Sequence, residues 1–124
     1  MNYDISLSED GKHIRVRVSG LITSSLQDSF IKDTIIEARK RSVWRFFVDM
    51  RDVRNVTTAF EQYSLAYEDM NKLALDRSSK IAVCVDEDDK SHDFVVTVFQ
   101  NAGFQCRSFT DESDALKWLA DGDP

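Results

Sequence analysis

The sequence predicts an α/β domain. An N-terminal β-hairpin should be followed by alternating strands and helices, giving a mostly parallel, single-wound sheet of about five strands with four helices. Residues 43–51 form a short apolar run closed by an acid, as in a strand buried in the middle of a parallel sheet. Segments with helical spacing precede and follow it, and the short links favour right-handed crossovers. At 124 residues, we expect one domain over 1–124.

The N-terminal hairpin is predicted from alternating hydrophobicity. Ile5 and Leu7 alternate with polar residues, and a second alternating run covers residues 13–18. Asp10-Gly11 lies between the two runs and is a strong hairpin signal, because glycine adopts a positive φ at little cost. The two strands should bury one face, with the first strand as the antiparallel edge of the sheet.

The first two helices flank the central strand. The first should begin at an N-cap, Ser24 or Ser25, and end at the basic run 39–41, whose positive charges suit a helix C-terminus. The second should open with a capping box that joins Thr58 to Glu61.

The second half of the chain predicts two further strands and two further helices. Residues 80–85 are nearly all apolar and should form a strand buried on both faces. Residues 94–102 have helical spacing, although their β-branched residues weaken that assignment. A short strand should follow over 104–109, and the last helix should have Thr110 as its N-cap.

Polar residues at the carboxyl ends of the strands are the first candidate site, because open α/β sheets place ligand and partner sites there. The candidates are Asp49, Arg51, Asp52, Asp86 and His92. We expect His92 to be a surface residue at the start of the third helix.

An aromatic stripe on the second helix is another candidate. Phe60, Tyr63 and Tyr67 are spaced to share one face. Such a stripe more often belongs to the core than to a ligand site. Two tyrosine hydroxyls each need a hydrogen-bond partner, however, which leaves open a groove along one edge of this helix.

Composition and missing motifs narrow the function. A net charge of −6 argues against nucleic acid and anionic membranes as partners. The chain has four glycines, and no phosphate-binding loop or nucleophile-elbow motif occurs. The two cysteines, Cys84 and Cys106, belong to no C-x-x-C pair, so we expect buried reduced thiols. No signal peptide or membrane span is apparent, which favours a cytoplasmic protein.

Acidic residues offer the one arrangement that resembles a metal site. Asp49 and Asp52 follow one strand and residues 86–89 follow the next, and clustered carboxylates can hold Mg²⁺. A solvated loop with helix-capping acids explains the same residues. We therefore expect no metal and no cofactor, and keep a metal-assisted enzyme at these strand ends as a second alternative function.

Several runs of residues carry a family resemblance. They are 20–23 (GLIT), 66–70 (AYEDM), 80–87 (KIAVCVDE), 98–103 (VFQNAG) and 108–119 (SFTDESDALKWL). With them, nearly the whole chain resembles the STAS-like superfamily, in its branch of small bacterial STAS and CRAL-TRIO-related proteins with an anti-anti-sigma-factor-like fold. The resemblance implies a single-wound β/α sheet and a binding module without enzymatic activity of its own.

The same resemblance implies a modification site. In the anti-anti-sigma branch, a kinase phosphorylates a serine in an Asp-Ser-Ser-Gly turn after the central strand. The matching turn here is 57–60, which lacks the Asp and the Gly, so the implied phosphoacceptor is Thr57 or Thr58.

Two binding functions lead the interpretation. The first is a regulatory or protein-interaction module that uses the turn from Arg51 to Thr58 and the helix from Phe60. The alternative is a carrier for a small apolar or lipid-like ligand, which requires an apolar cavity bounded by Tyr63, Tyr67 and neighbouring helices. We also expect a homodimer through exposed apolar residues on the third helix, around Phe94 and Val98.

Overall fold

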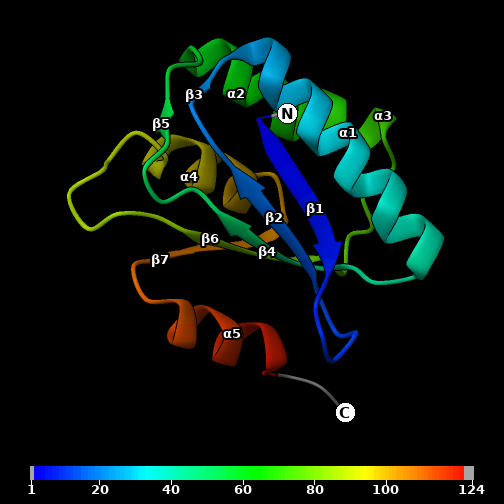
Figure 1. The fold of residues 1–124 in the computed structure, drawn as a ribbon. Helices are drawn as coiled ribbons and strands as arrows, with labels where there is room; N and C mark the ends of the chain where they lie inside the picture. Colours follow the sequence, from blue (N-terminus) through cyan, green and yellow to red (C-terminus); the bar gives the residue numbers. More distant parts are fainter. Residues whose placement is uncertain (1, 122–124) are drawn as a thin grey trace.

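The centre of the fold is a five-stranded sheet, drawn in Figure 1 from the computed structural model, which describes residues 2–121. Its strands are β1 (Tyr3–Leu7), β2 (Ile14–Val18), β4 (Arg45–Asp49), β6 (Lys80–Cys84) and β7 (Gln105–Phe109). They lie in the order β1-β2-β4-β6-β7. The hairpin of β1 and β2 is antiparallel, and every other pair is parallel. The predicted sheet is confirmed, with β4 in the middle position.

Four helical segments connect and cover the strands: α1 (Ser24–Arg41), a continuous helix made of α2 (Ala59–Ser64), η1 (Leu65–Asp69) and α3 (Met70–Lys72), then α4 (Asp93–Asn101) and α5 (Glu112–Ala120). In Figure 1 the first three segments lie on one face of the sheet and α5 lies on the other. The three crossover connections therefore share one face, as a single-wound sheet requires.

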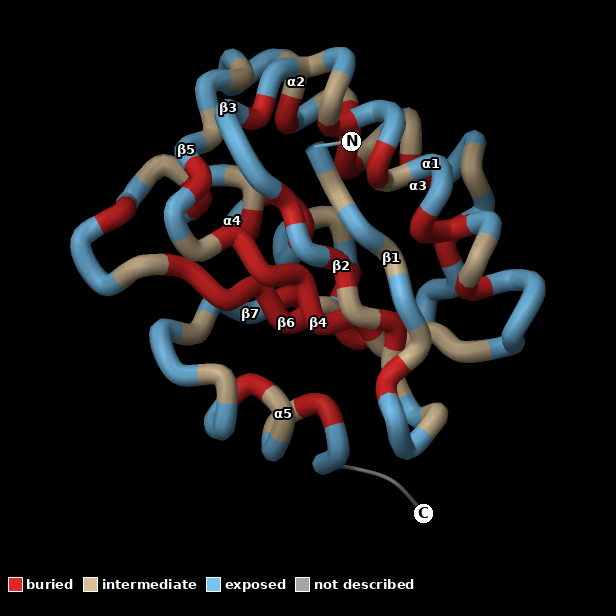
Figure 2. Tube along the Cα trace, viewed as in Figure 1, coloured by how far each residue is buried: buried red, intermediate tan, exposed pale blue. Residues whose placement is uncertain are grey.

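The pleat of β4 divides the core in two. Phe46 and Val48 belong to a large apolar cluster on the α1, α2 and α4 side, whereas Phe47 faces α5. This follows from the two-residue period of a strand, which sends successive side chains to opposite faces. Figure 2 shows the resulting band of buried residues along β4 and β6. No helix within residues 2–121 is long and apolar enough to cross a membrane.

Two helix starts differ from prediction by one residue. Thr23, rather than Ser24 or Ser25, caps α1, and its side chain accepts a hydrogen bond from the N–H of Leu26. Asp111, rather than Thr110, caps α5. Both caps are residues of the type that favours this position, and several candidates stood side by side in the sequence.

A second, two-stranded sheet was not predicted. It pairs β3 (Leu21–Ile22) with β5 (Arg54–Asn55) in parallel. Each strand has only two residues, too short for a periodic pattern in the sequence. This small sheet ties the start of α1 to the turn that follows β4, next to the start of α2 (Figure 1).

Candidate functional site

Asp49 and Arg51 lie together at the end of β4. The Nε and Nη2 of Arg51 donate to the two carboxylate oxygens of Asp49, both at 2.9 Å. Arg51 Nη2 also lies 3.0 Å from Glu112 Oε1, at the start of α5. Arg17 Nη1, on β2, is 3.2 Å from Asp49. The pair therefore links β2, β4 and α5, and each of its charges is engaged within the fold.

The Asp49 carboxylate is held in its charged form. Burial by itself would raise its pKa, but hydrogen bonds from the side chain and backbone of Arg51, with the charges of Arg17 and Arg51, outweigh burial. The net result is a pKa below the ordinary value for aspartate. Asp49 is therefore suited to hold cations in place rather than to donate a proton at neutral pH.

Asp52 and Asp86 join the turns that follow β4 and β6. The backbone N–H of Asp52 donates to Asp86 Oδ2 at 2.6 Å. Asp52 has a φ of 64°, in the left-handed region that Asp and Asn tolerate best among residues with a side chain. Within residues 2–121, no group of three or more His, Cys, Asp or Glu side chains is arranged to hold a metal ion. These two acids shape the loops instead.

His92 is buried, and the prediction that it lies on the surface was wrong. Its exposed fraction is 1%. Its Nε2 donates to the carbonyl oxygen of Val53 at 2.7 Å and lies 3.5 Å from Asp89 Oδ2. The segment around β5 covers this histidine, and the N–H of Asn55 donates to Ser91 Oγ at 3.0 Å. His92 thus anchors the turn after β4 to the start of α4.

The aromatic stripe on α2 points outward at its N-terminal end, contrary to the core position that its spacing favoured. Phe60 is 70% exposed and Tyr63 is 54% exposed. The inward face is made instead by Gln62, Leu65 and Ala66, which are spaced as one helical face. The Nε2 of the buried Gln62 donates to Thr57 Oγ1 at 2.8 Å, whereas its Oε1 has no hydrogen-bond partner within residues 2–121.

Tyr63 and Tyr67 stack on each other, with Tyr63 exposed and Tyr67 packed against the large core. Their ring centroids are 4.4 Å apart and their planes differ by 20°. Burial, followed by the neighbouring Tyr63, raises the pKa of Tyr67. The helix widens here into η1, where the N–H of Met70 bonds to the carbonyl of Leu65, five residues earlier. Such widened turns are frequent at functional sites.

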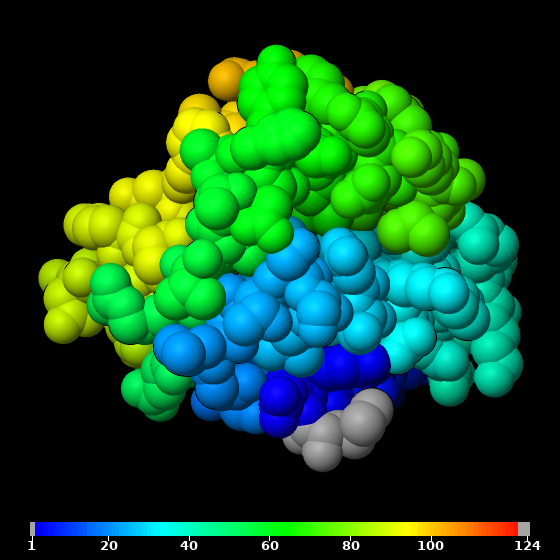
Figure 3. All heavy atoms as spheres, turned by 90° about the horizontal axis from the view of Figure 1, so that it is seen from above, coloured from blue at the N-terminus to red at the C-terminus, as the bar shows by residue number. Residues whose placement is uncertain are grey.

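Exposed apolar side chains gather near this helix. The residues are Leu21 on β3, Val56 after β5, and Phe60 and Tyr63 on α2, and we call them the β3–α2 face. They are four of the six most exposed large apolar side chains among the described residues. Figure 3 views the molecule from this side, with α2 beside the segment of β3 and the start of α1. Sequence reasoning included Val56, Phe60 and Tyr63 in the expected surface but missed Leu21, which lies on the two-residue strand β3.

The two candidate phosphoacceptors differ in accessibility. Thr57 is half-buried, and its hydroxyl donates to Asn55 Oδ1 at 2.6 Å while accepting from Gln62. Thr58 is exposed and is the N-cap of α2, as predicted. Its Oγ1 accepts from the N–H of Glu61 at 3.1 Å, and Glu61 Oε1 accepts from the N–H of Thr58 at 2.9 Å.

A cavity of about 110 Å³ lies in the large core, between the sheet and the helices α1, α4 and η1. Neither Tyr63 nor Tyr67 lines it, although both were expected to bound such a cavity.

The apolar face on the third helix also differs from prediction. Phe94 is exposed, but Val98 is buried and faces the core. The homodimer stays a prediction. Of the two residues expected at its interface, only Phe94 is exposed, because Val98 is buried.

Comparisons with known proteins identify related families and folds. The model of the SpoIIAA-like family matches residues 13–120. Among solved structures, the chain is similar to an anti-sigma factor antagonist from Mycobacterium paratuberculosis, with a TM-score of 0.62 and 16% sequence identity. That match covers 96% of this chain and 95% of the other. At this identity it shows a shared fold. A comparison with curated proteins finds no match.

Proposed function

Because the chain belongs to the SpoIIAA-like family, we propose that it is a non-enzymatic regulatory module that acts by binding another protein. The binding surface we propose is the turn from Arg51 to Thr58 together with α2 from Phe60, which includes most of the β3–α2 face. Binding would take place in the cytoplasm. The family match and the shared fold support the general class of function.

The observation that carries the proposed surface is the exposure of Phe60 and Tyr63 beside Val56. Large aromatic side chains are enriched in the buried centres of protein interfaces. Exposed apolar groups that gather on one face are typical of interaction sites, whereas scattered ones need no explanation. The Arg51–Asp49 bonds and the separate bond from His92 to Val53 hold the turn at two points, which supports a preformed surface that needs little further ordering on binding.

We propose an anti-sigma factor as the class of partner. The fold match is to a protein whose title describes it as an anti-sigma factor antagonist, and the class is transferred from that description. The test is titration calorimetry of this protein against the purified anti-sigma factors of its own host. Binding by at least one of them is expected.

Surface variants locate the contact. Val56→Ser and Phe60→Ser should each weaken binding about tenfold or more, because an apolar anchor is lost from the interface. Ile36→Ser is the matched control, since Ile36 is 50% exposed, close to the 54% of Val56, but lies on α1, outside the β3–α2 face. Equal binding by all four proteins would rule out this surface, and a lack of binding to any anti-sigma factor would rule out this partner class.

We further propose Thr58 as the residue through which binding is regulated. Of the two candidate threonines, Thr58 is the exposed one, while the Thr57 hydroxyl is engaged in two hydrogen bonds. A phosphate at a helix N-terminus is favoured by the helix dipole. It would also repel the Glu61 carboxylate, whose charged form is favoured chiefly by the bond from the Thr58 N–H, which keeps the pKa of Glu61 low. Phosphorylation would thereby open the capping box at the edge of the proposed surface.

Intact mass spectrometry tests this regulation after incubation with the host's kinases and ATP. The wild-type protein and Thr57→Val should each gain one phosphate, whereas Thr58→Ala should gain none. An unmodified wild-type protein, or a phosphate that persists in Thr58→Ala, would contradict the assignment.

A further inference from the structure

Negative charge gathers beside the exposed aromatic side chains of α2. The residues are Asp28 on α1, Glu61 on α2 and Asp69 on η1, and we call them the acidic flank. The hydroxyl of Ser24 donates a hydrogen bond to Glu61, which brings the first turns of α1 and α2 together. Figure 3 shows these two segments side by side at the surface. Because Glu61 directly follows the exposed Phe60, the acidic flank borders the β3–α2 face.

The three carboxylates of the acidic flank repel one another. Asp28 is exposed, yet partial burial and then the negative charges of Asp69 and Glu61 raise its pKa. No Lys or Arg is among the groups that shift this pKa. Within residues 2–121, none of the three carboxylates forms a salt bridge. Their charges are therefore not neutralised by an ion pair in the described part of the chain.

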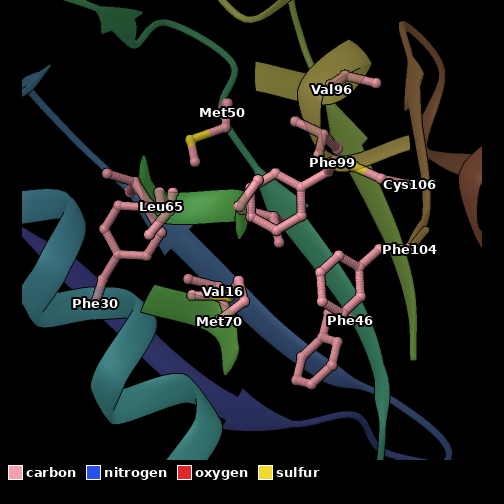
Figure 4. Close-up of a cluster of buried hydrophobic side chains, with 14 of the residues drawn as sticks. Val16, Phe30, Phe46, Met50, Leu65, Met70, Val96, Phe99, Phe104 and Cys106 are labelled. Carbon is pink, nitrogen blue, oxygen red and sulfur yellow. The ribbon is translucent and has the colours of Figure 1, made fainter. Parts of the chain in front are cut away.

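The core prevents the two helices from separating to relieve this repulsion. Figure 4 shows Phe30 from α1 and Leu65 from η1 approaching the same region of the large apolar cluster. Asp28 lies two residues before Phe30, and Asp69 lies one residue before the buried Met70. The backbone beneath the acidic flank is thus anchored on both helices, and the negative charge is in place before a partner binds.

We propose that the protein partner of this surface presents an apolar patch flanked by Lys or Arg side chains, and that these cations pair with the acidic flank. Charge complementarity of this kind steers association and selects among partners. The inference rests on the proposed binding surface, to which it adds the charge of the partner. It does not depend on the partner being an anti-sigma factor.

The same charges argue against other occupants of this face. A second copy of the chain, bound through the same face, would bring one acidic flank close to the other, because a two-fold contact uses the same patch twice. The chain as a whole has a net charge of −6, which adds to that repulsion. Nucleic acids and anionic membranes are also negatively charged and do not fit the acidic flank.

Three helical peptides with the same apolar stripe test the proposal by NMR titration of the full chain. Their flanking positions carry Lys, Gln or Glu. The Lys peptide should bind about tenfold more tightly than the Gln peptide at low salt, since three exposed ion pairs together contribute about that factor. It should also shift the backbone amide signals of Asp28, Phe60 and Tyr63. The Glu peptide should bind most weakly, and the Lys preference should shrink at high salt because exposed charges are screened.

Variants separate the charged and apolar parts of the surface. Asp28→Asn should lower the Lys preference about two- to threefold, and the double variant with Asp69→Asn should remove most of it. Asp4→Asn is the matched control, because Asp4 is exposed on β1 and the change in net charge is the same as in Asp28→Asn. It should keep the Lys preference of the wild type. Phe60→Ser should weaken binding of all three peptides, since an apolar anchor is lost.

Several outcomes would overturn the inference. They are equal affinity of the wild type for the Lys and Glu peptides, no binding of any peptide, or a full Lys preference in the double variant. An anti-sigma factor that needs Phe60 but binds the double variant as tightly as the wild type would refute this inference and leave the proposed function intact. A Lys preference in the peptides without binding to any anti-sigma factor would overturn the partner class alone.

Discussion

Replacing Arg51 with methionine should destabilise the protein by about 1.5–3 kcal/mol at pH 7, the range measured for hydrogen bonds to charged groups. Arg51 makes two hydrogen bonds to Asp49, both at 2.9 Å, and one to Glu112 at 3.0 Å. Methionine keeps much of the aliphatic length but has no donor. The change removes the side-chain link between the end of β4 and the start of α5.

The two partners of Arg51 contribute unequally to this estimate. The side chains of Arg51 and Glu112 are each 36% exposed, so solvent screens that pair and its share is about 0–1 kcal/mol. The Asp49 side chain is only 12% exposed, so its bonds account for most of the loss. Asp49 still keeps Arg17 at 3.2 Å and the backbone N–H of residue 51 at 3.1 Å. These remaining contacts keep the loss below that of a fully unpaired buried charge, about 3–5 kcal/mol.

The effect of Arg51→Met should depend on pH in a defined direction. Asp49 has a lowered pKa in the folded protein, so its contribution is present above the unfolded pKa of about 3.9 and is lost as pH falls through the folded pKa. Removal of Arg51 takes away the main group that lowers this pKa. The stability difference between wild type and variant should therefore be full at pH 7 and smaller at pH 3.

Urea unfolding, followed by the fluorescence of Trp44 and Trp118, measures these differences at both pH values. Arg54→Met is the matched control, because Arg54 is exposed on the same turn, and its effect should stay within about 0.5 kcal/mol. A double-mutant cycle that combines Arg51→Met with Asp49→Asn should give a coupling energy of about 1–2 kcal/mol between the two side chains. A coupling near zero, or a stability difference for Arg51→Met that is the same at pH 7 and pH 3, would refute the reasoning.

Three further predictions concern the helix cap, the buried histidine and the thiols. Thr58→Ala should cost about 1 kcal/mol of stability in urea unfolding, because the capping box is lost, and Thr58→Ser should restore most of it. His92→Phe should cost about 1–3 kcal/mol, since the carbonyl of Val53 loses the donor at 2.7 Å; an unchanged midpoint would contradict this. Cys84 and Cys106 are buried with raised pKa values, so iodoacetamide at pH 8 should add no mass to the folded protein and two adducts in urea.

The candidate site could be predicted only in part. Asp49 and Arg51 were correctly placed at one strand end, because the end of an apolar run and the parallel sheet together determine that position. Their bonds to each other and to Glu112, 61 residues away, depend on how α5 packs.

The sequence by itself determined the order and type of the elements and several of their ends. Alternating residues predict the hairpin, the apolar run predicts β4, and Thr58 with Glu61 predicts the start of α2. These signals are local, because each depends on neighbours within one turn or one strand.

Only the tertiary structure decided which side chains are covered. Phe60 is exposed while Gln62 is buried, with its Nε2 donating to Thr57 from the adjacent turn. His92 is buried because Val53, 39 residues away, folds over it. Burial is the sum of contacts between distant segments, and the sequence of one segment does not contain the position of the others.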